Sequence, residues 1–323
     1  MPLLAKVAFF LAALAFLIAL AISIQFFRYP LATTVWLRRK RLQRAGFAKM
    51  TAETSFGSQM VWQGGKGPLL VLLHGAGDQA GTWHKVAPDL AKNYSLVMPD
   101  LAGHGQSAPA SGPLSLGTIL EALGHVLDSS EWKSQSFVLA GNSLGAWIAM
   151  LYAHKHPERV SRLLLINGGA LKGLQTEISL TPKTREDARR AFDAILDPAT
   201  PRPPDFVLDD LVRVTNHGPM ARLMATEAEI PNYVLDGKLG DFPVPVDILW
   251  GASDRLVPID YARALKEQLP AARLTVIERC GHAPQLECPT KMLTALHSAL
   301  AAGPPPGKGL VPKESTNAEF QPG

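Results

Sequence analysis

The five-residue segment G-N-S-L-G at positions 141–145 constrains this chain more than any other feature of its sequence. An apolar run at 137–140 precedes it and is typical of a buried strand, and the run at 146–153 that follows it is typical of a helix. The chain must therefore turn from strand to helix within a few residues, which strains the serine backbone and admits only small neighbours. The pattern predicts that Ser143 is a nucleophile exposed at the end of a sheet strand. A chance match in a surface loop, the alternative, would lack the flanking strand and helix.

A serine hydroxyl is a poor nucleophile, so it needs a base to take its proton and a third group to orient that base. Asp254 follows an apolar run at 246–251 that is typical of a strand, and His282 follows a second such run at 274–277. Because the carboxyl ends of parallel strands meet at one edge of a sheet, we expect both residues to lie near Ser143. Their order along the chain also differs from the orders in chymotrypsin-like and subtilisin-like proteases. The sequence therefore predicts a triad of Ser143, Asp254 and His282.

A fourth part of such a site binds the oxyanion that forms when the serine attacks a carbonyl. The apolar run at 69–73 predicts a strand, and the small residues of H-G-A-G at 74–77 follow it directly. We expect the backbone N–H groups of Ala76 and Leu144 to point at one position above the sheet and to form the oxyanion hole. Loss of one such donor costs about 3 kcal/mol of transition-state stabilisation. The alternative is an ordinary glycine-rich turn between a strand and a helix.

With these motifs in the same order, the chain resembles the α/β-hydrolase superfamily over about residues 58–300. The motifs that carry the resemblance are H-G-A-G at 74–77, D-L-A-G-H-G-Q-S at 100–107, G-N-S-L-G at 141–145, W-G-A-S-D at 250–254 and G-H at 281–282. The resemblance implies a mostly parallel sheet with helices on both faces, and a turn-shaping role for Asp100, His104 and Ser107. Haloalkane dehalogenases and soluble epoxide hydrolases of this superfamily carry an aspartate as nucleophile, so Ser143 counts against both.

Alternating strand-like and helix-like runs predict the same α/β fold. The expected strands lie near 59–63, 69–73, 95–99, 136–140, 162–166, 246–250 and 273–277, and the expected helices near 82–91, 115–128, 144–156, 259–268 and 289–301. Between about 171 and 244 the alternation stops, and only helical runs with proline breaks remain. In this superfamily such an insertion usually forms a lid over the active site; the alternative is a surface elaboration without a role in binding.

The first fifty residues predict a membrane anchor. Val7–Phe27 contains only two polar residues, and a helix of 21 residues can span a hydrocarbon core of about 30 Å. Five Arg and Lys residues follow between Arg38 and Arg44, so the positive-inside rule predicts a single-pass protein with its catalytic domain on the cytoplasmic side. A cleaved signal peptide is the alternative, although its apolar region would usually be shorter and a basic cluster downstream opposes export. The basic cluster also suits anionic lipid headgroups.

These patterns divide the chain into three parts. Residues 1–50 form the anchor with its basic juxtamembrane segment, residues 51–302 form the α/β-hydrolase domain with its lid insertion at about 171–244, and residues 303–323 form a disordered tail rich in proline and glycine.

Charge and cysteine content exclude other classes of function. Residues 1–50 hold eight basic and no acidic residues, which leaves 24 basic and 28 acidic residues, a net charge of −4, for the remainder. The folded domain therefore lacks the basic surplus of a nucleic-acid-binding protein. Cys280 and Cys288 are interpreted as free thiols, which suits a reducing compartment. No pattern predicts a metal site or a cofactor, and nothing in the sequence predicts an oligomeric state.

We conclude from the sequence that the protein is a serine hydrolase of carboxylic esters that acts through an acyl-enzyme. An anchor together with a lid resembles the membrane-bound monoacylglycerol-lipase type of the superfamily, which implies small lipid esters as substrates. One alternative is carbon–carbon bond hydrolysis of ring-cleavage diketones, because G-N-S at 141–143 and G-H-A-P-Q at 281–285 resemble segments of those enzymes. Another is a catalytically silent α/β-hydrolase scaffold that serves as a binding protein.

Overall fold

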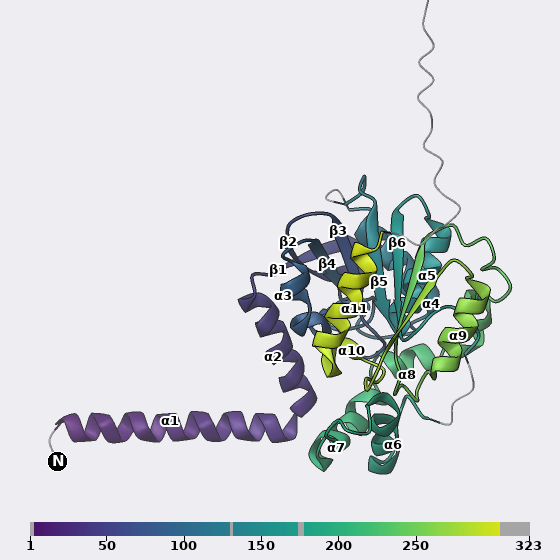
Figure 1. Ribbon diagram of the computed structural model, residues 1–323. Helices are drawn as coiled ribbons and strands as arrows, with labels where there is room; N and C mark the ends of the chain where they lie inside the picture. The colour runs from purple at the N-terminus through teal and green to yellow at the C-terminus, as the bar shows by residue number, and fades with distance from the viewer. Residues whose placement is uncertain (1–2, 130–131, 174–177, 304–323) are drawn as a thin grey trace, which may run out of the picture.

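An eight-stranded sheet runs through the globular part of the chain (Figure 1). The computed structural model describes residues 3–129, 132–173 and 178–303, and the tail expected to be disordered lies outside them from residue 304 on. The strand order is β1-β2-β4-β3-β5-β6-β7-β8; β2 pairs antiparallel with β1 and with β4, and all other pairs are parallel. The strands are β1 (Ala48–Thr54), β2 (Gly57–Gly65), β3 (Leu69–Leu73), β4 (Ser95–Pro99), β5 (Phe137–Asn142), β6 (Val160–Ile166), β7 (Val246–Gly251) and β8 (Arg273–Ile277).

Helices cover both faces of this sheet, as the sequence predicts, and every residue of β3 is buried for that reason. Val71 and Leu73 belong to the apolar cluster on one face, whereas Leu70 and Leu72 belong to the cluster on the other. The first cluster is covered by α4 (Leu116–Leu127), α5 (Leu144–Lys155) and α9 (Ile259–Gln268). The second is covered by α2 (Pro30–Arg44), the short helices η1 (Ala80–Lys85) and α3 (Ala87–Leu90), and α11 (Pro289–Ala301).

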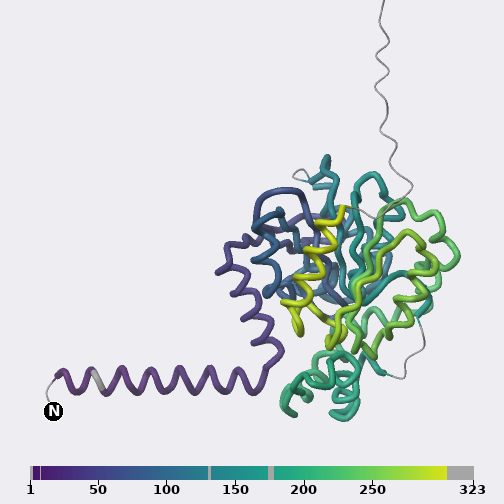
Figure 2. Tube along the Cα trace, in the orientation of Figure 1, coloured from purple at the N-terminus to yellow at the C-terminus, as the bar shows by residue number. Residues whose placement is uncertain are grey.

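The N-terminal helix α1 (Leu3–Arg28) projects away from the globular part (Figure 2). It is 26 residues long, and its most apolar 18-residue stretch has a mean hydropathy of 2.8 and no buried residue. The helix is therefore long and apolar enough to cross a membrane. The chain then turns at Tyr29, because Pro30 disfavours helical backbone at the residue before it and opens α2 as its first residue.

Helix α2 and strand β1 were not expected from the sequence. Leu42 of α2 is fully buried against the second cluster, and β1 begins at Ala48, before the boundary expected at residue 50. The juxtamembrane segment is therefore a packed element of the catalytic domain as well as a connection to α1.

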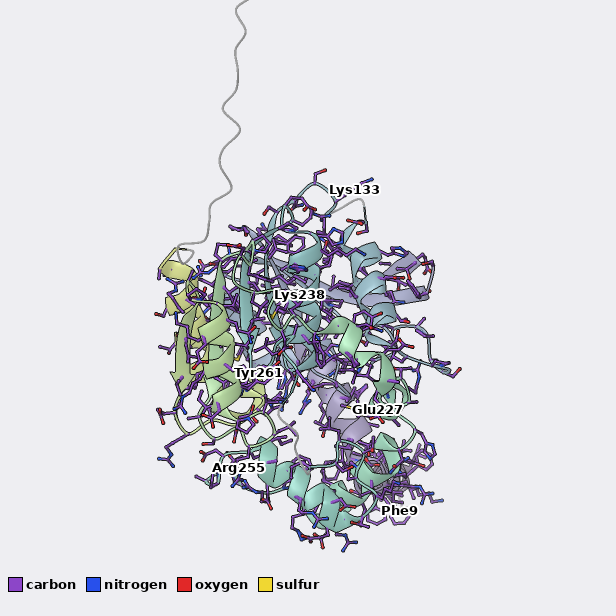
Figure 3. All side chains as sticks on the ribbon, turned by 90° about the vertical axis from the view of Figure 1, so that its right-hand side faces the viewer. Phe9, Lys133, Glu227, Lys238, Arg255 and Tyr261 are labelled. Atoms are coloured by element: carbon purple, nitrogen blue, oxygen red, sulfur yellow. A yellow bond between two sulfur atoms is a disulfide. The ribbon has the colours of Figure 1, made fainter. Side chains whose placement is uncertain are left out.

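The insertion between β6 and β7 is helical, and its helices are α6 (Arg185–Ile195), α7 (Asp205–Thr215), α8 (Pro219–Met224) and η2 (Glu227–Tyr233). Helix α7 was not expected, because the prolines before it suggested a break; Pro204 instead precedes its first turn. Figure 3 shows Arg255, the neighbour of Asp254, beside these helices, and Lys133 at the opposite end of the molecule. The insertion thus lies at the end of the sheet where the site residues are expected.

One expectation from the sequence is wrong. Cys280 and Cys288 form a disulfide, with their Cα atoms 5.9 Å apart, and no free cysteine remains among the described residues. Spacing alone did not indicate the pair, because the short helix α10 (Pro284–Glu287) folds the segment back and brings the two residues together. The bond closes a nine-residue loop that carries His282, and a disulfide does not suit the reducing compartment inferred from free thiols.

Candidate active site

Ser143 occupies the sharp turn between β5 and α5 in a strained conformation. Its φ is +55°, which is rare for a residue with a side chain, and it precedes the first turn of α5. The small neighbours are required by space, since a Cβ on Gly141 would lie 2.2 Å from the backbone of Gly145, and one on Gly145 would lie 2.4 Å from the carbonyl oxygen of Leu73. This is the strand–turn–helix geometry that the sequence predicts.

The loop after β3 lies directly against Ser143. A Cβ on Gly75 would come within 3.2 Å of the Ser143 Cβ, which is closer than most such contacts, so a side chain there would press on Ser143. In the described part of the chain, the N–H groups of Ala76 and Leu144 donate to no other residue, which leaves both donors available to a ligand.

His74 holds the shape of this loop from inside the protein. The N–H of Leu101 donates to His74 Nε2 at 2.9 Å, so the ring proton sits on Nδ1, which donates to the Gly75 carbonyl at 2.7 Å. That carbonyl also accepts the N–H of Asp78, at 3.2 Å. Because the Gly75 carbonyl and the Ala76 N–H belong to one peptide group, both contacts fix the direction of that N–H.

Asp254 and His282 are brought together although 28 residues separate them. His282 Nδ1 donates to Asp254 Oδ2 at 2.7 Å, and both side chains are nearly inaccessible to solvent. The other carboxylate oxygen accepts the N–H groups of Leu256 and Val257, at 3.0 and 2.9 Å. The carboxylate is thus fixed in place and can hold the imidazole with Nε2 free of the proton, which is the tautomer a general base needs.

Asn167 is a further partner of Asp254 that the sequence analysis missed. Its side-chain Nδ2 donates to Asp254 Oδ2 at 2.7 Å, and its Oδ1 accepts the N–H of Gly251 at 3.2 Å. Asn167 has a φ of +49° at the end of β6, a conformation that asparagine tolerates better than most residues. An asparagine followed by two glycines at the exit of a strand was the available signal.

Asn142 and Gln285 link the elbow to the loop that carries His282. Asn142 Nδ2 donates to the carbonyl oxygen of His282 at 2.9 Å, and Gln285 Nε2 donates to Asn142 Oδ1 at 2.9 Å. The residue next to Ser143 therefore holds the backbone of His282. Among the described residues the His282 Nε2 and the Ser143 hydroxyl make no hydrogen bond, to each other or to a third group.

The turn at 100–107 is held by its own hydrogen bonds, in line with the structural role that the resemblance implies. Ser107 Oγ donates to the Asp100 carbonyl at 2.6 Å, and the Asp100 carboxylate accepts the N–H groups of Ala80 and Gln106. Burial lowers the pKa of His104 to about 3, so this histidine stays neutral at the end of the turn. Within the described ranges, no group of three His, Cys, Asp or Glu side chains could hold a metal ion.

Comparison with known proteins assigns the chain to a family. Residues 70–295 match the alpha/beta hydrolase family. A 2-hydroxy-6-oxononadienedioate/2-hydroxy-6-oxononatrienedioate hydrolase of Cupriavidus pinatubonensis is 28% identical over 245 residues, which cover 68% of this chain and 81% of that protein. Monoacylglycerol lipase ABHD6 of Homo sapiens is 26% identical over 259 residues, which cover 74% of this chain and 77% of that protein.

Solved structures agree with this assignment. The crystal structure of a membrane phospholipase A, described as a bacterial virulence factor, superposes with a TM-score of 0.69 and 25% sequence identity. The superposition covers 91% of this chain and 98% of that chain. With the profile match over most of its length, this chain belongs to the alpha/beta hydrolase family.

Proposed function

We propose that the protein is a serine hydrolase that cleaves carboxylic esters, in particular small lipid esters, through an acyl-enzyme. The observation that carries this proposal is the strained Ser143, which lies against the 74–77 loop with its free N–H groups. Its neighbour Asn142 holds the backbone of His282, and the His282 ring is bound to the buried Asp254. Nucleophile, base and orienting group are the parts that acyl transfer requires.

In the proposed mechanism, Ser143 Oγ attacks the ester carbonyl while His282 Nε2 takes its proton. Asp254 stabilises the imidazolium that results, and the N–H groups of Ala76 and Leu144 donate to the oxyanion of the tetrahedral intermediate. His282 then returns the proton to the departing alcohol, which leaves an acyl group on Ser143. A water molecule, deprotonated by His282, attacks this acyl-enzyme; the bond to Ser143 Oγ breaks, the proton passes from His282 to Oγ, and the acid is released.

A fluorophosphonate probe tests the nucleophile. We expect the full-length protein to be labelled and Ser143→Ala not to be, whereas Ser298→Ala, which changes an exposed serine on α11, should be labelled normally. Labelling of Ser143→Ala at the wild-type rate would refute the assignment. Failure of the wild-type protein to react would favour a catalytically silent scaffold instead.

The lipid substrate is supported by the apolar helix α1 and by the relatives named a monoacylglycerol lipase and a membrane phospholipase A. A series of p-nitrophenyl esters of increasing acyl length, measured beside monoacylglycerols, tests it. We expect kcat/KM to rise from acetyl to octanoyl, because each buried methylene contributes about 0.8 kcal/mol. A preference for acetyl would contradict a lipid substrate.

Carbon–carbon bond hydrolysis is a second candidate, favoured by the ring-cleavage hydrolase among the relatives and by the contact between Asn142 and Gln285, which joins the two segments that resemble those enzymes. A 2-hydroxy-6-oxo dienoate substrate, assayed at the same enzyme concentration as the best ester, separates the two. Turnover of the dienoate with the higher kcat/KM would favour this candidate.

We also propose that α1 anchors the protein in a membrane and that α2 lies at the membrane surface. The basic side chains of α2 are divided between its two faces: Arg39 binds Asp100 at 3.2 Å, whereas Lys40 and Arg44 are exposed together with Trp36. An exposed aromatic side chain beside basic ones suits the headgroup layer. Extraction with alkaline carbonate should leave the protein in the membrane fraction, and its release would refute a spanning helix.

Orientation follows from the basic residues after α1, and the proposed side for the catalytic domain is the cytoplasm. The disulfide between Cys280 and Cys288 is the opposing observation, because disulfides persist in oxidising compartments. Reporter fusions at the C-terminus decide between the two sides: alkaline phosphatase is active only outside the cytoplasm, and a fluorescent protein that needs a reducing environment is active only inside it.

A further inference from the structure

The C-terminal end of helix α6, in the lid insertion, contacts both loops that carry the proposed acid and base. The N–H of His282 donates to the Ile195 carbonyl at 2.8 Å, and the N–H of Arg255, the neighbour of Asp254, donates to the Ala194 carbonyl at 2.8 Å. These bonds involve backbone atoms of the reactive loops themselves. A shift of this end of α6 would therefore move the backbone of His282.

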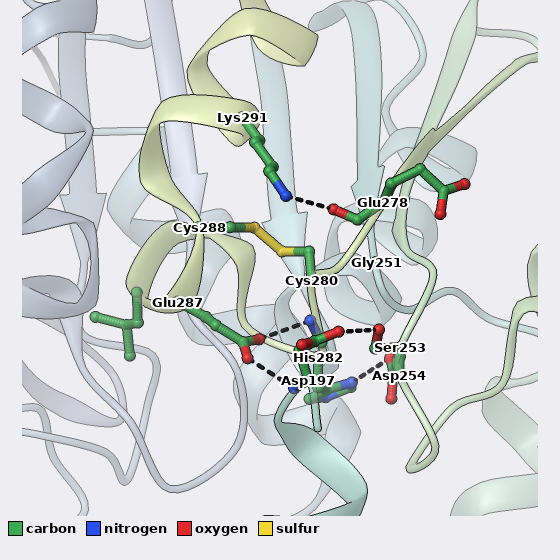
Figure 4. The surroundings of a disulfide bond; sticks show 12 residues. Asp197, Gly251, Ser253, Asp254, Glu278, Cys280, His282, Glu287, Cys288 and Lys291 are labelled. Carbon is green, nitrogen blue, oxygen red and sulfur yellow. Dashed lines mark hydrogen bonds and ion pairs between the residues drawn. A yellow bond between two sulfur atoms is a disulfide. The ribbon is translucent and has the colours of Figure 1, made fainter. Parts of the chain in front are cut away.

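Glu287 joins the same two elements through its side chain (Figure 4). Its Oε2 accepts the N–H of Gly281, the residue before His282, at 2.6 Å. Its Oε1 accepts the N–H of Asp197 at 2.7 Å and the hydroxyl of Thr200 at 2.6 Å, both just after α6. One carboxylate thus bridges the histidine loop and the lid, inside the loop that the disulfide closes.

Asp197 extends this bridge to the loop that carries the acid. Its Oδ2 accepts the hydroxyl of Ser253, the residue before Asp254, at 2.5 Å, and its Oδ1 accepts the N–H of Ala199 at 2.9 Å. The hydrogen bond from Ser253 lowers the pKa of Asp197, with a further contribution from Ala199, so this carboxylate is charged at neutral pH. The residues immediately before the acid and before the base are therefore connected through the lid.

There is little free space in this contact. A Cβ on Gly281 would lie 2.2 Å from the carbonyl oxygen of Ile195 and 2.7 Å from Glu287 Oε2. The histidine loop and the lid consequently approach each other at backbone distance, and neither can shift by much without breaking the bridge.

We propose that Glu287 is a positioning residue for His282: with Asp197 it clamps the end of α6 to the loops of the acid and the base, so that this part of the lid belongs to the catalytic machinery. The inference rests on the proposed function, because the clamp has a catalytic role only if His282 is the general base. It also implies that substrate reaches Ser143 past other parts of the insertion, since movement of the α6 end would displace the base.

Glu287→Gln is the sharpest test, because it preserves the shape of the side chain. The carboxylate accepts three hydrogen bonds, whereas an amide has one oxygen and must direct its NH₂ group at one of the N–H donors. We expect kcat for the best p-nitrophenyl ester to fall about tenfold with KM changed less than threefold, since the variant loses a charge-assisted hydrogen bond that holds the loop of His282. Labelling by the fluorophosphonate should slow in parallel, because it needs the same base.

Active-site titration separates positioning from loss of folded protein. The rate divided by the concentration of molecules that the fluorophosphonate labels at completion gives kcat per folded enzyme, and a displaced base should lower this value in Glu287→Gln. Fewer folded molecules would reduce the labelled fraction and leave kcat per labelled molecule unchanged. Glu278→Gln is the matched control, because Glu278 lies nine residues earlier and its side chain points away from His282 (Figure 4); its kinetics should equal those of the wild type.

A double-mutant cycle with Asp197→Asn tests whether the two carboxylates act together. If they form one clamp, the double variant should lose little more activity than the poorer single variant, whereas independent effects would multiply. A wild-type kcat per labelled molecule in Glu287→Gln would overturn the clamp even if Ser143 is confirmed as the nucleophile. Labelling that persists in Ser143→Ala would overturn the clamp together with the proposed function.

Discussion

Removal of the Asn167 side chain is the perturbation whose outcome the site geometry defines best. Asn167→Gly deletes the donor 2.7 Å from the Asp254 carboxylate and the acceptor of the Gly251 N–H. Glycine adopts the observed φ of +49° without strain, so the backbone can remain as it is. The variant therefore removes the hydrogen bonds of the side chain and little else.

The expected losses of kcat/KM and of folding free energy follow from the hydrogen-bond partners of Asp254. Without Asn167 the carboxylate keeps three donors, from His282, Leu256 and Val257, but its Oδ2 is held by the histidine alone. A hydrogen bond to a charged group contributes about 1.5–3 kcal/mol, so kcat/KM should fall by roughly 10- to 150-fold if that orientation matters fully in the transition state. The buried N–H of Gly251 loses its acceptor, which should cost about 1–3 kcal/mol of folding free energy.

Steady-state kinetics on a short p-nitrophenyl ester, with thermal unfolding of the same samples, measures both effects. Asn167→Asp serves as a second variant, because it sets a carboxylate beside Asp254 and two such charges at 2.7 Å cannot both be ionised. We expect it to be less active at neutral pH than Asn167→Gly. A kcat/KM of Asn167→Gly within about twofold of the wild type would refute the idea that this amide orients the acid.

Three further outcomes are expected. A Cβ on Gly168 would lie 2.5 Å from the backbone oxygen of Ser143, so Gly168→Ala should lower kcat at least tenfold. The control is Gly124→Ala, where a Cβ meets no atom within 4 Å and kcat should not change. Equal kinetics of the two variants would contradict the tight packing at the elbow. Cys280→Ser opens the loop around His282 and should lower the unfolding temperature and kcat together, and dithiothreitol should have the same effect on the wild type only. The pKa of His104 is about 3 in the folded state and about 6.5 in the unfolded state, so the unfolded protein binds a proton that the folded protein does not between these pH values. The free energy of unfolding should therefore fall by about 1.4 kcal/mol per pH unit as the pH drops from 6.5 toward 3. Urea titrations should show that it falls less steeply in His104→Gln.

Local patterns were sufficient to predict seven of the eight strands and the position of the elbow. Apolar runs mark these seven strands, and the strand at 69–73 is buried on both faces as its sequence requires. The turn at Ser143 was predictable because its cause is steric and acts between neighbours: only glycine fits at 141 and 145. The roles of Ser143, Asp254, His282, Ala76 and Leu144 in catalysis stay predictions for the experiments above.

Other features depend on which distant segments meet, and a single sequence does not reveal this. Asn167, Gln285 and Glu287 resemble ordinary polar residues until the fold sets them beside the loops of the acid and the base. The basic cluster at 38–44 suggested membrane topology and contact with anionic headgroups, yet Arg39 binds Asp100 on the hydrolase domain.

Composition, periodicity and glycine spacing thus determined the fold class and the elbow of this protein, because they express constraints between residues a few positions apart. The tertiary structure alone decided the disulfide, the bridge through Glu287 and the partners of Asp254, because hydrogen bonds and covalent links form wherever the packed chain brings suitable atoms within about 3 Å, at any separation in sequence.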